Sequence, residues 1–305
     1  MSPARYRQVT IGALVALAVI IVTGAAVRLT NSGLGCDDWP NCSSERLIDV
    51  SSKHAAIEQI NRFFTGVVGI AVIAAVLGSL VRRPRRRDLT VLSAWLVVGV
   101  IANAVLGGIS VLVDLHPIAV QGHLLLSMAL IVAAATLVRR AGEPDDVPRA
   151  PAVSEPAKRL VLALFVLTSL AVFTGTLVTG AGPHAGDEEA ERLDIAIPTV
   201  ARLHGATVMI TIGVALLIAW RIRTAADDRD ALVNPLSTWI FVGVLQAALG
   251  YVQYFNGVPE LLVGLHVAGA TAVMLVTTHV LLATTRPVAD HAPAPAAPLA
   301  TAAER

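Results

Sequence analysis

The sequence predicts an all-α polytopic membrane protein, with eight transmembrane helices arranged as two pseudo-symmetric four-helix bundles. An apolar composition, eight long charge-free stretches and an internal repeat support this fold class. Of the 305 residues, 55% are hydrophobic and only 15% are charged, with a mean hydropathy of +0.70. Soluble domains carry about 25% charged residues, so lipid is the main solvent of this chain. No nucleic-acid motif or basic domain occurs.

Stretches of about 18 apolar residues are long enough to cross a bilayer. The first of the eight could instead be a signal peptide, but it lacks a preceding basic cluster and is longer than the usual apolar core of a signal. We therefore interpret it as a span. The eight stretches are Val9–Val27, Phe63–Val81, Leu89–Val113, Pro117–Val138, Leu160–Gly182, Leu203–Trp220, Leu236–Phe255 and Leu261–Ala283.

The distribution of Lys and Arg predicts the orientation, because basic residues concentrate in cytoplasmic segments. With a cytoplasmic N-terminus, 17 of the 23 basic residues fall inside, including the run RRPRRR at 82–87. We expect a multi-pass protein of the plasma membrane with both termini in the cytoplasm. Residues 286–305 are rich in Ala and Pro and are expected to be disordered.

The only two cysteines lie in the first outer loop, in the segment CDDWPNC. Cys36 and Cys42 are close in sequence and on the oxidising side, which favours a disulfide over free or metal-binding thiols. No third soft ligand lies near them, although His54 is in the same loop.

An internal repeat appears at an offset of 143 residues. ANAVLGG at 102–108 resembles QAALGY at 246–251, His123 corresponds to His266, and Asn61 corresponds to His204. Trp95 and Trp239 miss this register by one residue. We expect two parallel halves, residues 1–140 and 159–285, joined by a cytoplasmic linker, 141–158.

The repeat places two histidines at matching depth. His204 and His266 each lie near the outer end of a span, and those two spans run in the same direction. Ionisable side chains inside a membrane are costly and usually functional, and facing imidazoles in a four-helix bundle suit a haem with two axial ligands. The alternative is that each histidine hydrogen-bonds a neighbouring helix.

The first half differs from the second at this position, since it has Asn61 where the second half has His204. Asn is a poor haem ligand, so His54 is a candidate replacement, with a solvated loop histidine as the alternative. Glu58 and Arg62 share a helix face with Asn61. Arg62 could bind a haem propionate and Glu58 could manage a proton or charge near the iron, although an interfacial salt bridge would also explain them. Arg202 could bind a propionate in the second half.

The chain resembles the haem A synthase family, of the bacterial, actinobacterial type. The resemblance covers nearly the whole chain up to about residue 285. It rests on VRLTNSGLGCDDWPNC (27–42), EQINR (58–62), QGHLLLS (121–127), ARLHGAT (201–207) and GLHVAGA (264–270).

The resemblance implies a function. The C-terminal half would hold haem b between His204 and His266. The N-terminal half would oxidise the C8 methyl group of haem o to a formyl group, giving haem A, with Glu58 as the catalytic carboxylate and His123 on the iron. The family pattern there is Glu-x-x-His-Arg, and Asn61 departs from it, so one iron position could be open to oxygen or water. The disulfide would brace the outer loop over this site.

The resemblance also implies partners. A haem o synthase would act upstream, and assembly of a haem-A-containing terminal oxidase would consume the product. Membrane lipid surrounds the chain, and the oligomeric state, including a homo-oligomer, stays open. One alternative function is a di-haem cytochrome b that transfers electrons and makes no haem product. A transporter is less favoured, because the prolines Pro117, Pro198 and Pro259 lie at span ends or in loops.

Overall fold

The computed structural model describes residues 1–145 and 147–288, and eight long helices make up most of this part of the chain. All eight are long and apolar enough to cross a membrane. The prediction of an all-α polytopic membrane protein with eight spans is therefore confirmed. The helices are α1 (Pro3–Leu29), α2 (Lys53–Val81), α3 (Arg87–Leu112), α4 (Pro117–Ala141), α5 (Glu155–Ala181), α6 (Ile197–Arg221), α7 (Ala226–Phe255) and α8 (Glu260–Leu282).

Several helices begin well before the apolar stretches that predict them. Helix α2 begins at Lys53, and the hydroxyl of its N-cap, Ser52, accepts a hydrogen bond from the Ala55 amide at 3.1 Å. The polar segment from Glu58 to Arg62 is therefore helical, as its spacing requires. Helix α7 begins at Ala226, before the predicted span Leu236–Phe255, and so contains Pro235, which adjoins the end of that span.

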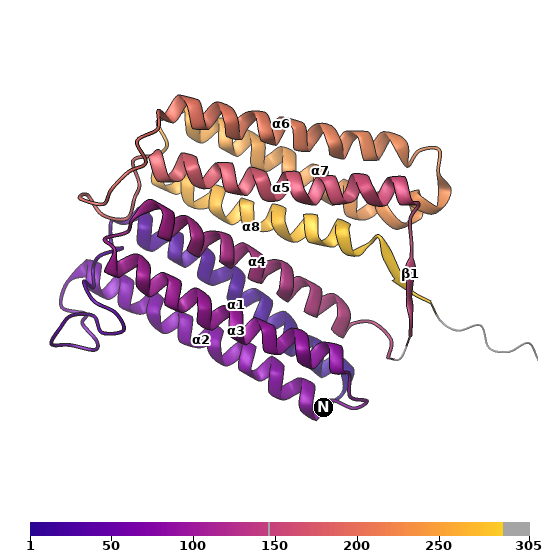
Figure 1. Cartoon of the computed structure of the whole chain (residues 1–305), viewed down its shortest axis with the longest axis horizontal. Helices are drawn as coiled ribbons and strands as arrows, with labels where there is room; N and C mark the ends of the chain where they lie inside the picture. Colours follow the sequence, from indigo (N-terminus) through magenta and orange to yellow (C-terminus); the bar gives the residue numbers. More distant parts are fainter. Residues whose placement is uncertain (146, 289–305) are drawn as a thin grey trace, which may run out of the picture.

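The helices pack as two closed four-helix rings with the same connectivity (Figure 1). In the first ring α1 contacts α2 and α4, and α3 contacts the same two helices; α5 to α8 repeat this pattern. The rings meet through α4 against α8, α1 against α8 and α4 against α5. If the two halves are exchanged, the contact of α1 with α8 becomes that of α5 with α4, and the contact of α4 with α8 is unchanged. The interface therefore has the pseudo-symmetry that the repeat predicts.

The two ends of the molecule differ (Figure 1). The long loops 30–52 and 182–196 share one end, named here the disulfide end. The opposite end, named the strand end, has the N-terminus, the α2–α3 turn and two short strands. Strands β1 (Arg149–Pro151) and β2 (Thr285–Pro287) pair antiparallel, which ties the linker to the residues after α8. Of the expected disordered tail, residues 286–288 are thus ordered, and 289–305 lie outside the described residues.

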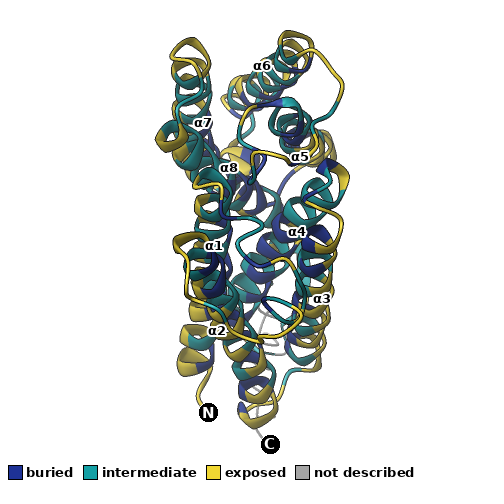
Figure 2. Ribbon diagram, turned by 90° about the vertical axis from the view of Figure 1, so that its left-hand side faces the viewer, coloured by how far each residue is buried: buried dark blue, intermediate teal, exposed yellow. Residues whose placement is uncertain are grey.

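Each ring has its own apolar core, and many residues on the outer faces of the helices are exposed, as expected for a surface that faces lipid (Figure 2). Trp239 is only 2% exposed, and its indole donates a hydrogen bond to the Thr277 hydroxyl at 2.7 Å. Trp95 is 65% exposed, whereas the adjacent Leu96 is 1% exposed. Leu96 is therefore the packing counterpart of Trp239, and the one-residue mismatch of the tryptophans places them on different helix faces.

Candidate functional site

Two large cavities lie inside the helix rings, toward the disulfide end. The N-terminal cavity has a volume of about 580 Å³ and is lined by His123, Asn61 and Glu58, among others. The C-terminal cavity has a volume of about 590 Å³ and is lined by His204 and His266. Both volumes lie in the range typical of pockets for small molecules and cofactors. The cavities adjoin, because four residues line both: Leu124, Thr179, Val263 and Val267.

The C-terminal cavity brings His204 and His266 together, as the repeat predicts. Their ring centroids are 6.4 Å apart, and the ring planes are inclined at 82°. A bond between a metal and an imidazole nitrogen is about 2 Å long. The separation therefore leaves room for a single metal atom between the rings.

Backbone carbonyls fix two of the imidazoles. Nδ1 of His204 lies 3.0 Å from the Ala171 carbonyl oxygen, and Nδ1 of His123 lies 3.0 Å from the Asn103 carbonyl oxygen. A carbonyl only accepts, so each Nδ1 carries the proton and each Nε2 keeps its lone pair for a ligand. In the described part of the chain, no group of three or more His, Cys, Asp or Glu side chains could hold a metal ion. Two imidazoles without a third donor suit haem iron better than zinc.

Asn61 occupies the place in the N-terminal cavity that His204 occupies in the other. Its side-chain oxygen accepts a hydrogen bond from the Thr23 hydroxyl at 2.9 Å. In the second half, the Thr174 hydroxyl hydrogen-bonds Nδ1 of His204 at 3.2 Å. The two pairs are thus copies of one arrangement, and the sequence analysis missed both threonines.

The missed signal is a Thr-Gly dipeptide that occurs at 23–24 and again at 174–175, an offset of 151 rather than 143. The register changes because the loop after α1, 30–52, is eight residues longer than the loop after α5, 182–196. An insertion in a loop shifts the numbering of every residue after it without altering the packing of the helices, so only α1, which precedes the longer loop, has the larger offset.

Glu58 is a buried acid that faces the N-terminal cavity, with an exposed fraction of 6%. One carboxylate oxygen accepts a hydrogen bond from the Cys36 amide at 2.8 Å, and the other pairs with the Arg62 guanidinium at 2.7 Å. Among the described residues it is the only carboxylate that lines either cavity. The residue that corresponds to Glu58 in the second half is Ala201, so the N-terminal cavity has an acid that the C-terminal cavity lacks.

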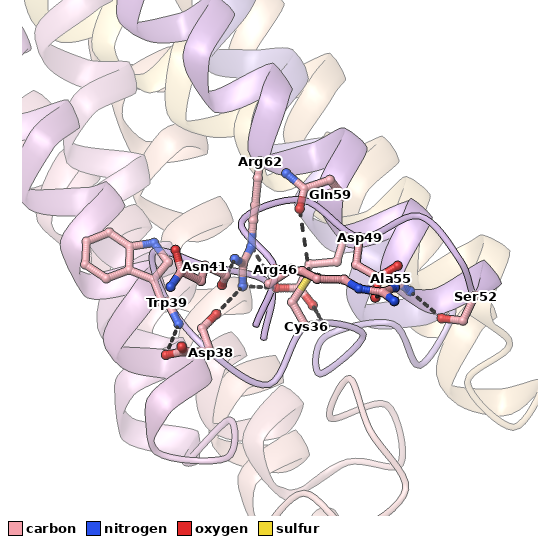
Figure 3. The surroundings of a disulfide bond; sticks show 12 residues. Cys36, Asp38, Trp39, Asn41, Arg46, Asp49, Ser52, Ala55, Gln59 and Arg62 are labelled. Carbon is pink, nitrogen blue, oxygen red and sulfur yellow. Dashed lines mark hydrogen bonds and ion pairs between the residues drawn. A yellow bond between two sulfur atoms is a disulfide. The ribbon is translucent and has the colours of Figure 1, made fainter. Parts of the chain in front are cut away.

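Arg62 connects α2 to the disulfide loop (Figure 3). Besides Glu58, it donates to the carbonyl oxygens of Asn41 at 2.8 Å and Asp38 at 3.0 Å. The structure joins the sulfurs of Cys36 and Cys42 in the same loop. Most of the donors of Arg62 are therefore used within the chain, and its binding of a propionate stays a prediction.

The remaining candidates lie at the edges of the cavities. Arg202 is exposed and lines the C-terminal cavity. His54 is exposed, hydrogen-bonds the Ser32 hydroxyl at 2.9 Å and is not part of the cavity lining. The structure therefore does not bring His54 to the position opposite His123.

Two further residues that the sequence did not single out line the N-terminal cavity. Arg28 donates to the Thr179 carbonyl oxygen at 2.9 Å, but its buried Nε has no partner in the described part of the chain. His184, from the 182–196 loop of the second half, hydrogen-bonds the Val258 carbonyl at 2.8 Å. An arginine that lines an apolar cavity is typical of a carboxylate-binding position.

Fold and site together define a polytopic membrane protein with two pseudo-equivalent imidazole-lined cavities, one of which has a buried acid. Residues 7–59 and 47–186 match the COX15-CtaA family, described as cytochrome oxidase assembly protein. These segments cover more than half of the chain, which therefore belongs to the COX15-CtaA family.

Individual relatives agree with this assignment. A protein named heme A synthase from Halalkalibacterium halodurans is 25% identical over 264 residues, which are 82% of this chain and 85% of the relative. The heme A synthase of Shouchella clausii is 25% identical over 255 residues, 78% of this chain and 83% of the relative. A third, from Exiguobacterium sibiricum, is 26% identical over 171 residues, and this match spans 54% of this chain and 56% of that relative.

Proposed function

We propose that this protein is an oxidoreductase that converts the C8 methyl group of haem o into a formyl group, making haem A for the assembly of a terminal oxidase. The family membership and the names of the relatives support the reaction. The structure supports the proposal through two adjoining cavities of nearly equal size, only one of which has an acid.

The residues present fit two haem groups. His204 and His266 would hold haem b, since their rings are separated by the width of one coordinated metal atom. His123 would hold the substrate haem o, because its Nδ1 is bonded to Asn103 and its Nε2 is left for iron. Arg28 in the N-terminal cavity and Arg202 in the C-terminal cavity are placed to bind carboxylates such as propionates.

Conversion of a methyl to a formyl group is a four-electron oxidation. Written with water as the oxygen donor, R–CH3 and H2O give R–CHO, four protons and four electrons. Haem groups held by these histidines would supply the redox chemistry, and an external acceptor would take the electrons. The chain must accept protons next to the reacting carbon, and Glu58 is the group that can do so, because it lines the N-terminal cavity. The Cys36 amide and Arg62 hold its carboxylate in place.

The presence of Glu58 in one cavity and of Ala201 at its position in the other is the observation that carries the proposal. An electron carrier needs two sites that hold haem and has no use for a buried acid beside one of them, since an unneeded buried charge is costly. The same asymmetry supports an assignment of the chemistry to the N-terminal cavity and of an electron relay to the C-terminal cavity.

The test is co-expression of the full chain with a source of haem o, followed by extraction and mass analysis of the haems. Wild type is expected to yield haem A, and Glu58→Gln to lower its rate of formation by about a hundredfold or more, the contribution typical of a general acid or base. Glu260→Gln is the matched control, because Glu260 is exposed in the first turn of α8 and lines neither cavity.

Two outcomes would contradict the proposal. Haem extraction that shows only haem b from wild type would favour the di-haem electron carrier. Full haem A production by Glu58→Gln would remove Glu58 from the reaction.

The setting in the cell belongs to the same proposal. The strand end holds most of the Lys and Arg residues, so both termini would be cytoplasmic and the disulfide end would face outward. A haem o synthase would supply the substrate, and the membrane would be the plasma membrane.

A further inference from the structure

The N-terminal cavity retains the frame of a histidine site without its histidine. Thr23 holds Asn61 as Thr174 holds His204, with hydrogen bonds of 2.9 Å and 3.2 Å. Each threonine hydroxyl also lies within hydrogen-bond distance of the carbonyl oxygen three residues before it, at Ile20 and Ala171. The hydrogen-bonding partner at this position is thus kept while the metal-binding side chain is replaced.

The space next to Asn61 is empty where the second half has the imidazole ring of His204. A Cβ atom built on Gly175 would lie 3.2 Å from Cε1 of His204, so this glycine makes room for the imidazole ring. A Cβ atom built on the equivalent Gly24 would meet no atom within 4 Å. Both Gly24 and Asn61 line the N-terminal cavity, so the volume that a ring would fill belongs to the cavity.

The hydrogen bond from Thr23 also determines what Asn61 offers to the cavity. Because the side-chain oxygen of Asn61 accepts from Thr23, the amide nitrogen Nδ2 is left as a donor. It has no hydrogen-bond partner among the residues that the structure describes. A half-buried donor in an apolar cavity gains free energy from a ligand that accepts a hydrogen bond.

We propose that Asn61, held in place by Thr23, donates a hydrogen bond to a small oxygen ligand, water or dioxygen, on the haem iron that His123 would hold in the N-terminal cavity. This inference rests on the proposed function, since it requires a haem in the N-terminal cavity. Asn61 acts as a donor to the ligand and is not itself a ligand of the iron. Thr23 is a positioning residue that fixes the orientation of the amide.

Coordination is tested first, on the full chain loaded with haem and without turnover. Electron paramagnetic resonance of the oxidised wild type is expected to show one low-spin haem and one high-spin haem. Added imidazole should convert the high-spin signal to low-spin, and Asn61→His should do so without imidazole, because Thr23 and the space at Gly24 would receive the ring. Two low-spin haems in wild type would overturn the inference.

Hydrogen bonding is tested next by titrating the oxidised protein with fluoride, which accepts hydrogen bonds. Asn61→Leu and Thr23→Val are expected to weaken fluoride binding by about tenfold, the loss of one hydrogen bond to a charged acceptor. Thr174→Val is the matched control and should leave fluoride binding unchanged, because Thr174 contacts His204 in the second half of the chain and not Asn61. Equal fluoride affinity in all variants would contradict the role of Asn61.

Carbon monoxide binding to the reduced protein distinguishes the two ligands. Binding to one haem in wild type and to neither in Asn61→His would assign the position to a diatomic gas; fluoride binding alone would assign it to water. If neither probe binds although two haems are present, this inference fails and the proposed function stands. If only one haem binds per chain, the proposed function fails as well.

Discussion

At the scale of single residues, the rings of the three cavity histidines each lie against a glycine. A Cβ atom would lie 2.9 Å from His123 at Gly107, 3.2 Å from His204 at Gly175 and 3.0 Å from His266 at Gly250. These distances are shorter than ordinary contacts between carbon atoms. Each imidazole ring therefore occupies space that is free only because the neighbouring residue is a glycine.

Gly250→Ala tests this role. The added methyl group must push Cε1 of His266 away from its present position, because the helix backbone of α7 cannot retreat without losing its packing on α8. We expect about tenfold weaker haem binding in the C-terminal cavity, a loss typical of changes around metal ligands. Haem content and the low-spin signal of the purified protein measure the effect.

Gly213→Ala is the control for that substitution, since a Cβ atom there meets nothing within 4 Å and the residue is exposed on α6. Its haem content should equal that of wild type. Normal haem content in both variants would mean that the glycine contact does not fix His266.

At the scale of elements, the disulfide loop and the start of α2 form one unit. Gly35 lies so close to the start of α2 that a Cβ atom would be 2.3 Å from the His54 carbonyl oxygen. Arg62, Glu58 and the Cys36 amide then connect the loop to the helix through hydrogen bonds. The loop is therefore positioned by the same residues that hold the proposed catalytic carboxylate.

Arg62→Gln is expected to release this loop. Removing one member of a buried ion pair costs about 3 kcal/mol, because Glu58 would be left without its counter-charge. Trypsin should then cleave after Arg46, an exposed loop residue, at least about tenfold faster than in wild type. Haem A production should fall in parallel, since the carboxylate loses its orientation.

Arg192→Gln is the comparison for the loop. Arg192 lies in the 182–196 loop at the same end and, within the described part of the chain, donates only to carbonyls of its own loop, at Ala190 and Pro183. Cleavage after Arg46 should stay at the wild-type rate in this variant. An unchanged rate in Arg62→Gln would show that the disulfide alone holds the loop.

At the scale of the whole molecule, the architecture can be predicted from two patterns in the sequence, the apolar stretches and the repeat. Bilayer thickness sets the length of each apolar stretch, and the polar coincidences His123–His266 and Asn61–His204 identify two equivalent halves. The structure confirms the eight spans and brings His204 and His266 together. The contacts between the rings could not be predicted, because apolar side chains on lipid-facing and partner-facing surfaces look alike.

Details of the cavities depended on features that are weak in sequence. Thr23 and Thr174 escaped notice because unequal loops change the repeat offset from 143 to 151. Arg28, in the last turn of α1, and His184, in the 182–196 loop, come together at the N-terminal cavity where the 30–52 and 182–196 loops meet and the Gly33 amide donates to the Gly186 carbonyl oxygen. Such long-range loop contacts have no local periodicity from which to predict them.

The adjoining cavities lead to a last prediction about the molecule as a whole. Residues of α4, α5 and α8 line both cavities, so electrons from the N-terminal site have a short path through the ring interface to the C-terminal site. His266→Ala should remove the haem of the C-terminal cavity and leave the N-terminal one, because His123 and its partner Asn103 belong to the first ring.

In that variant haem extraction should give one haem per chain instead of two, and haem o should accumulate without conversion, since its electrons have no exit. His279→Ala is the matched control, because His279 lies near the opposite end of α8 and lines neither cavity. It should keep both haems. If His266→Ala still makes haem A at the wild-type rate, the C-terminal site is not on the electron path.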